Sequence, residues 1–149
     1  MVVGSKYDPL GGHNLAEMFS FDSATTGKWK SIPSYPSKPA IYAAPIVFVE
    51  RTWSFYVIGG TDGEDEIKDI IAYSMEWRIV GALNQKRHGH GAIWTGDSLV
   101  VVGGGRYDTE KCSFGSGGNI TCSHLSSGSM NSEMQYPELF LFTVDYCSE

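Results

Sequence analysis

The chain has 149 residues, enough for one ordinary domain with a hydrophobic core. Its 18 glycines, 13 % aromatic residues and only 19 % charged residues suit a globular protein of short strands and turns, and they exclude a disordered one. The net charge of −6, with no basic run longer than Lys86-Arg87, argues against a nucleic-acid partner. No apolar stretch approaches the roughly 20 residues that span a bilayer, so we expect no membrane insertion. The start, MVVGSKYD, lacks the long apolar core of a signal peptide.

Short apolar runs follow one another along the chain, and almost none of the sequence has helical spacing. The runs are rich in β-branched and aromatic residues and are bounded by Gly, Pro, Asp, Asn or Ser. This pattern predicts an all-β protein of short strands. In chain order the runs are MFSF (18–21), AAPIVFV (43–49), SFYVI (54–58), IIAY (70–73), AIW (92–94), LVVV (99–102) and LFLFTV (139–144).

Two of these runs end in a glycine pair and share one form, which indicates an internal repeat. SFYVIGG at 54–60 and SLVVVGG at 98–104 both begin with Ser and close with Gly-Gly, and their starts lie 44 residues apart. MVVGS at 1–5 has the same form without its beginning and with Ser5 in place of the second glycine. A polar loop and an aromatic strand follow each of them, and a tryptophan follows two of these strands. The aromatic strands are LAEMFSFD (15–22), KDIIAYS (68–74) and ELFLFTVD (138–145), and the tryptophans are Trp29 and Trp77.

Together these features resemble the kelch repeat of β-propellers. The marks that carry the resemblance are the glycine pairs Gly59-Gly60 and Gly103-Gly104, the aromatic downstream of each pair, Trp29 and Trp77, and the turn FDSATTGKW. The resemblance implies a kelch-type propeller segment of about three four-stranded blades that stack on one another. The expected blades are 1–36, 37–84 and 85–149, the first and last incomplete, and the third carries a long polar loop over 105–137. Both ends of the chain look truncated, so we expect further blades from the rest of a longer chain or from another subunit.

The three cysteines lie in the last quarter of the sequence, at 112, 122 and 147. A Cys112–Cys122 disulfide would staple the long loop and leave Cys147 to pair elsewhere or stay free. Pairing of Cys147 with Cys122 or with Cys112 remains open, as do three reduced thiols. Asn119-Ile120-Thr121 is an N-glycosylation sequon within a Gly/Ser-rich stretch. Sequon and cysteines together favour an extracellular or secreted protein, with a cytoplasmic one as the alternative.

Two clusters invite a metal-site interpretation. His88-Gly89-His90-Gly91 aligns with the non-ligating IYAA at 41–44 and has no third ligand nearby, so we expect structural histidines. On a strand the two rings would lie on one face. The acidic stretch GTDGEDEIKD at 60–69 lacks the late glutamate of a calcium loop and is expected to be a solvated turn. We therefore predict no metal site, no cofactor and no catalytic residue.

The expected function is protein–protein interaction or scaffolding through loops on the propeller face. The predicted partner-binding residues are Arg106, Tyr107 and Tyr136 in the long loop, which are residue types common at interface hot spots. One alternative is part of a kelch-scaffold enzyme similar to the copper radical oxidases, whose catalytic residues would lie mostly outside this sequence. Another is a structural segment of a large extracellular assembly. Because propellers host many activities, the fold alone does not choose between them.

Overall fold

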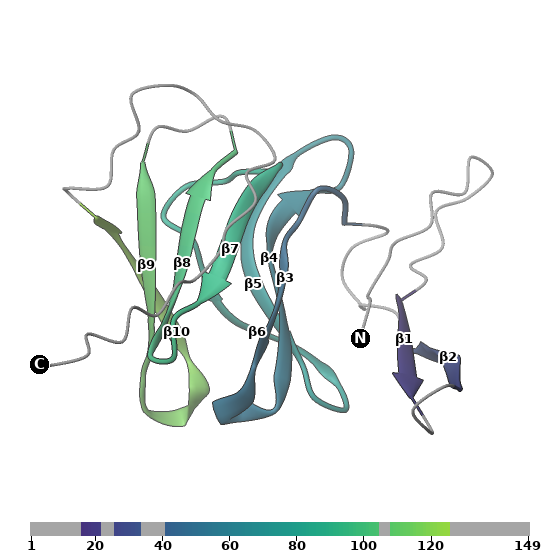
Figure 1. Cartoon of the computed structure of the whole chain (residues 1–149). Coiled ribbons are helices and arrows are strands. Elements are labelled where there is room, and N and C mark those ends of the chain that lie inside the picture. Colours follow the sequence, from purple (N-terminus) through teal and green to yellow (C-terminus); the bar gives the residue numbers. More distant parts are fainter. Residues whose placement is uncertain (1–15, 22–25, 34–40, 105–107, 126–149) are drawn as a thin grey trace, which may run out of the picture.

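The computed structural model describes residues 16–21, 26–33, 41–104 and 108–125, and this part of the chain is all-β (Figure 1). The predicted fold class is therefore confirmed at the level of all-β. No helix in the described residues is long and apolar enough to cross a membrane. The strands are β1 (Ala16–Phe21), β2 (Gly27–Ile32), β3 (Ile46–Val49), β4 (Ser54–Thr61), β5 (Glu66–Tyr73), β6 (Trp77–Ala82), β7 (His90–Trp94), β8 (Ser98–Gly103), β9 (Thr109–Phe114) and β10 (Ile120–Leu125), with 3₁₀ turns at Glu50–Thr52 and Ser116–Gly118.

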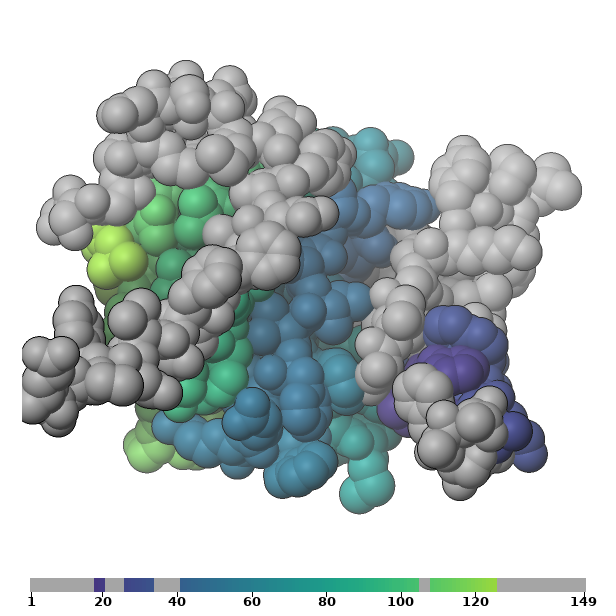
Figure 2. Space-filling view, in the orientation of Figure 1, coloured from purple at the N-terminus to yellow at the C-terminus, as the bar shows by residue number. Residues whose placement is uncertain are grey.

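Eight of these strands form one sheet in the order β3-β4-β5-β6-β10-β9-β8-β7. It consists of two antiparallel four-stranded units, the first unit (β3–β6) and the second unit (β7–β10), each built by short hairpin connections. The outer strands β6 and β10 pair in parallel, and β3 also contacts β7, so the sheet nearly closes on itself like a barrel. The β1–β2 hairpin is a separate two-stranded sheet beside the first unit (Figures 1 and 2).

The hydrophobic core lies between the two units. Alternate residues of each strand point inward, as a half-buried strand requires, and Leu99, Val101, Ile58 and Ile70 are fully buried there. Each such side chain contributes about 1.5–3 kcal/mol relative to an exposed one. Phe114 closes the core at one end, with its ring centroid 5.5 Å from that of Tyr56 and 5.2 Å from that of Trp94. Neither unit could bury its inner face without the other.

The predicted long loop over 105–137 is wrong for its central part, because β9 and β10 occupy residues 109–114 and 120–125. These strands are rich in Lys, Glu, Ser and Thr, which obscured their period-2 pattern. Inward-facing Cys112 and Ile120 alternate with exposed Ser113 and Thr121, so the pattern was present in the sequence. The aromatic strand predicted at 138–145 lies outside the described residues.

The Cys112–Cys122 disulfide is present and joins the paired strands β9 and β10 within the core. The two cysteines are direct cross-strand partners, separated by 10 residues in sequence. By the chain-entropy model such a crosslink contributes about 3 kcal/mol through the unfolded state. It therefore fastens a hairpin that supplies few apolar side chains of its own. Cys147 lies outside the described residues.

The parallel junction between the two units depends on a glycine in β6. A Cβ at Gly81 would lie 2.3 Å from the carbonyl oxygen of Ile120 in β10, a contact that neither backbone can relieve by rotating a side chain. We expect Gly81→Ala to lower the free energy of unfolding by about 1–3 kcal/mol, the usual range for overpacking.

Urea unfolding measures this effect, and Gly115→Ala is its matched control. Gly115 has an ordinary φ of −82°. Within the part of the chain that the structure describes, a Cβ there would meet only the Asn119 carbonyl, at 3.5 Å. The control should change stability by less than about 0.5 kcal/mol. Equal midpoints for Gly81→Ala and the unsubstituted protein would contradict the β6–β10 pairing.

Candidate functional site

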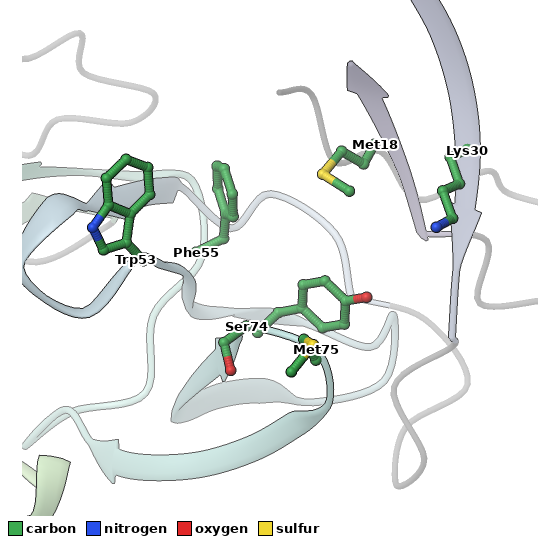
Figure 3. A pocket seen from close by; sticks show the side chains of 7 residues that line it. Met18, Lys30, Trp53, Phe55, Ser74 and Met75 are labelled. Atoms are coloured by element: carbon green, nitrogen blue, oxygen red, sulfur yellow. The ribbon is translucent and has the colours of Figure 1, made fainter.

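A groove of about 350 Å³ opens between the β1–β2 hairpin and the β3–β4 and β5–β6 turns (Figure 3). Its walls are mainly aromatic and thioether side chains, which is typical of ligand and peptide sites. The lining residues are Met18, Lys30, Trp53, Phe55, Tyr73, Ser74 and Met75. The groove thus combines residues from three segments that are remote in sequence.

Trp53 is the most prominent group at this groove. It follows the 3₁₀ turn Glu50–Thr52, and its N–H donates to the Glu50 carbonyl at 3.1 Å. This geometry places Trp53 at φ 48°, in the left-handed region that a bulky residue adopts at a cost of about 1–3 kcal/mol. The side chain is nevertheless 78 % exposed. The fold therefore holds a large apolar ring toward solvent in a strained turn.

A small aromatic cluster packs against the Trp53 ring. The Phe48 ring makes an edge contact with Trp53 at 5.7 Å between centroids and packs against Phe55 at 4.8 Å. Such pairs contribute about 0.5–1.5 kcal/mol beyond their buried area. Because Phe48 and Phe55 face each other across the β3–β4 pairing, they fix the base from which Trp53 projects.

The opposite side of the groove is held by a second aromatic pair. Tyr73 at the end of β5 lies 4.7 Å from Trp77 at the start of β6. The Trp77 indole N–H donates to the Pro33 carbonyl, which ties the segment after β2 to the first unit. Met75 lies in the turn between them and is 87 % exposed. Among the described residues, Lys30 is the one charged side chain that lines the groove, so the site suits an apolar ligand that bears a negative charge.

A second feature is a buried ionic network beneath the segment that connects the two units. Arg87 and Glu110 are both fully buried, and Arg87 Nη2 lies 2.6 Å from Glu110 Oε1. Arg87 Nη1 donates to the Gly103 carbonyl at 3.0 Å, and Nη2 also donates to Asp108 Oδ1 at 3.2 Å. The backbone N–H of Asn84 donates to Glu110 Oε2 at 2.7 Å. These contacts tie the connecting segment to β8 and β9, so the network is structural, although Arg87 Nε has no hydrogen-bond partner among the described residues.

The two histidines do not form the shared face that an extended His-x-His would give. Strand β7 begins at His90, and His88 precedes it, with its Nδ1 2.8 Å from Glu66 Oε1. His90 is only 5 % exposed and packs over Gly59 and Gly104, where a Cβ at either would lie 2.9 Å or less from its atoms. Burial first, and then the Arg87 charge, lower the pKa of His90 to about 4. The described residues contain no group of three potential metal ligands.

The remaining predicted residues fall in several places. Asn119 is exposed in the turn between β9 and β10. Trp29 is 55 % exposed on β2, against Phe19, and does not line the groove. All four repeat glycines, Gly59, Gly60, Gly103 and Gly104, have positive φ. The predicted partner-binding residues Arg106, Tyr107 and Tyr136 lie outside the described residues.

The sequence reasoning did not identify Trp53, Met75 or Lys30 as site residues. One signal was present: Trp53 stands in the four-residue interval between two apolar runs, where a turn rather than a core position was expected. Met75 likewise lies in the short SMEW turn. Their convergence on one groove depends on the pairing of β3 with β4 and of β5 with β6, which brings both turns to one end of the unit.

No protein-family model matches the sequence, and no curated protein does so either. Fifty-eight solved chains match the fold, among them one described as the structure of YjhT. That chain is similar with a TM-score of 0.57 and 16 % sequence identity, over 75 % of this chain and 39 % of YjhT. The present chain therefore spans less than half of the YjhT chain, and at this identity the similarity concerns the fold alone.

Proposed function

We propose that this chain is a segment of a kelch-type β-propeller that binds a protein partner outside the cell. The two four-stranded units support the propeller architecture, since each is an antiparallel meander whose second strand leads into a glycine pair of positive φ. In a propeller, such sheets stack on one another and present their turns at two opposite faces. The groove lies at the face formed by the β3–β4 and β5–β6 turns.

The observation that carries the binding proposal is the exposed Trp53. Tryptophan is among the residues most enriched at interface hot spots. A fold that strains its backbone while leaving the ring in water gains no core packing from this residue. Met75, 87 % exposed on the other side, adds an adaptable apolar surface. A protein contact would bury both side chains and offset the strain.

The partner that fits is an extended peptide segment with one large apolar side chain next to an acidic residue. The apolar side chain would enter between Phe55 and Met18, and the carboxylate would pair with Lys30 at the rim (Figure 3). The extracellular location is supported by the Cys112–Cys122 disulfide, because such bonds persist in oxidising compartments. We expect the protein to be a secreted glycoprotein.

Panning a random-peptide display library against the full chain tests this proposal. We expect enriched peptides to carry an apolar–acidic pair, and Trp53→Ala to weaken their binding at least about 30-fold, the effect of a hot-spot residue. Trp29→Ala is the matched control, since Trp29 is also exposed but lies outside the groove, and it should change binding less than about twofold. Peptides that bind both variants equally would refute the groove as the binding site.

A further inference from the structure

The turn between β9 and β10 presents the sequon in a way that suits a modified asparagine. Asn119 is exposed, with an extended backbone at φ −73° and ψ 145°, and its carbonyl accepts from the Gly115 N–H at 2.8 Å. Among the described residues, a Cβ at Gly117 would meet nothing within 4 Å, and a Cβ at Gly118 would meet only the end of the Arg78 side chain, at 3.7 Å. A glycan on the Asn119 side chain would therefore extend into solvent without displacing any strand.

The rest of the sequon is built into the sheet. Ile120 pairs with Phe114 of β9 and with Gly81 of β6, and Thr121 pairs with Ser113 and Ala82 of the same two strands. Ile120 is 5 % exposed in the core. The backbone of the tripeptide is thus held on both sides, and its carbonyl at Ile120 lies against the β6 backbone.

The disulfide also fixes the residue that directly follows the sequon. Cys122 directly follows Thr121 and is bridged to Cys112 on β9. An enzyme that modifies a sequon must bind the asparagine and the threonine together in its own active site. Reaching this tripeptide in the folded chain would require β10 to leave both neighbouring strands while the disulfide holds it to one of them.

We propose that Asn119 carries an N-linked glycan that is added before β10 enters the sheet and before the Cys112–Cys122 disulfide closes. This inference rests on the extracellular location proposed above. The donor is an oligosaccharide linked to a lipid diphosphate. A bond forms between Asn119 Nδ2 and the anomeric carbon of the sugar, the bond from that carbon to the diphosphate oxygen breaks, the lipid diphosphate leaves, and Nδ2 gives up one proton.

The site is tested by translating the full chain, behind an added signal sequence, into endoplasmic reticulum microsomes. We expect one upward step in apparent mass that peptide-N-glycosidase removes. Asn119→Gln and Thr121→Ala should abolish the step, whereas Thr121→Ser should keep it, because serine also supplies the sequon hydroxyl. A chain that stays unmodified in this assay would overturn the site.

The order of events is tested with purified, unglycosylated chain offered to oligosaccharyltransferase and its lipid-linked donor. The oxidised, folded chain should remain unmodified, and the reduced and alkylated chain should be modified at Asn119. Equal modification of both forms would overturn the order while leaving the site intact. A chain modified in microsomes but bare when isolated from its own source would overturn the native glycan at Asn119. Peptide binding at the groove is a separate result that neither assay affects.

Discussion

Replacing Glu110 by alanine should lower the free energy of unfolding by about 3–5 kcal/mol, the largest effect that we expect from a single substitution. The reason is that the substitution leaves Arg87 without its nearest negative charge. That guanidinium is fully buried, and Glu110 Oε1 is its closest anionic partner, at 2.6 Å. Without the carboxylate, a positive charge would remain in the protein interior with its solvation lost and only partly replaced.

Glu110 also holds the connection between the two units. Its Oε2 accepts from the backbone N–H and the side-chain amide of Asn84, at 2.7 and 3.0 Å, and its Oε1 lies 3.4 Å from the Gln85 N–H. These donors belong to the segment that leads from β6 to β7. The substitution should therefore remove the hydrogen bonds that hold the β6–β7 connection as well as the ion pair with Arg87. This raises the expected loss of stability toward the upper end of the 3–5 kcal/mol range, about 5 kcal/mol.

Urea unfolding with a constant m-value measures the change. Lys111→Met is the matched control, because Lys111 is the next residue on β9 and its ion pair with Asp97 is 3.8 Å long and largely exposed. The control should change stability by less than about 1 kcal/mol. The double variant Arg87→Met/Glu110→Leu should recover much of the loss, since it removes both buried charges together. A Glu110→Ala protein as stable as the control would contradict the network.

Stability should fall by about 3 kcal/mol as the pH is lowered from 6.5 to 4, through the titration of His90. Burial lowers the pKa of the folded ring from 6.5 to about 4. In this window the unfolded chain therefore binds a proton that the folded chain does not. Proton binding lowers the free energy of the unfolded state, so the folded protein becomes less stable. The contribution of His90 is fully present above pH 6.5 and is lost as the pH falls toward 4.

The packing explains why the ring stays neutral. Neither ring nitrogen of His90 has a hydrogen-bond partner within the described part of the chain. The Arg87 charge and, more weakly, His88 oppose protonation in addition to burial. The Ile58 backbone favours the protonated ring, but without a hydrogen bond of normal geometry it does not offset the burial.

Unfolding free energies measured from pH 7 to pH 4 for the unsubstituted protein and for His90→Phe provide the test. Phenylalanine has a similar ring and no proton to bind, and the carboxylates common to both proteins cancel in the difference. The gap between the two curves should therefore change by about 3 kcal/mol across this range. Parallel curves would show that His90 is accessible to solvent in the folded protein.

Much of the fold could be predicted from local sequence patterns. The strands around SFYVI and SLVVV are apolar and β-branched, and the glycines after them do adopt positive φ. The disulfide partners could be proposed from spacing within one segment. β9 was missed because a buried glutamate interrupts its apolar pattern. Glu110 is tolerated there only because Arg87, 23 residues earlier, neutralises it, and a local window does not contain that partner.

The candidate groove could not be predicted from local sequence patterns either, because its residues also come from distant segments. Trp53 and Met75 are apolar residues that composition alone assigns to a core. Their exposure follows from turn geometry, and their proximity to Met18 and Lys30 follows from the placement of the β1–β2 hairpin. Arg106, Tyr107 and Tyr136 remain predictions, since they lie outside the described residues.

The amino-acid sequence by itself determined that this chain forms short strands joined by glycine-rich turns, because period-2 patterning and turn chemistry act between near neighbours. Only the tertiary structure decided that β6 pairs with β10, that Arg87 pairs with Glu110, and that His90 is buried against Gly59 and Gly104. Those contacts join residues far apart in the chain. Their free energy depends on exclusion of water and on a fixed geometry, which exist only after the two four-stranded units have packed together.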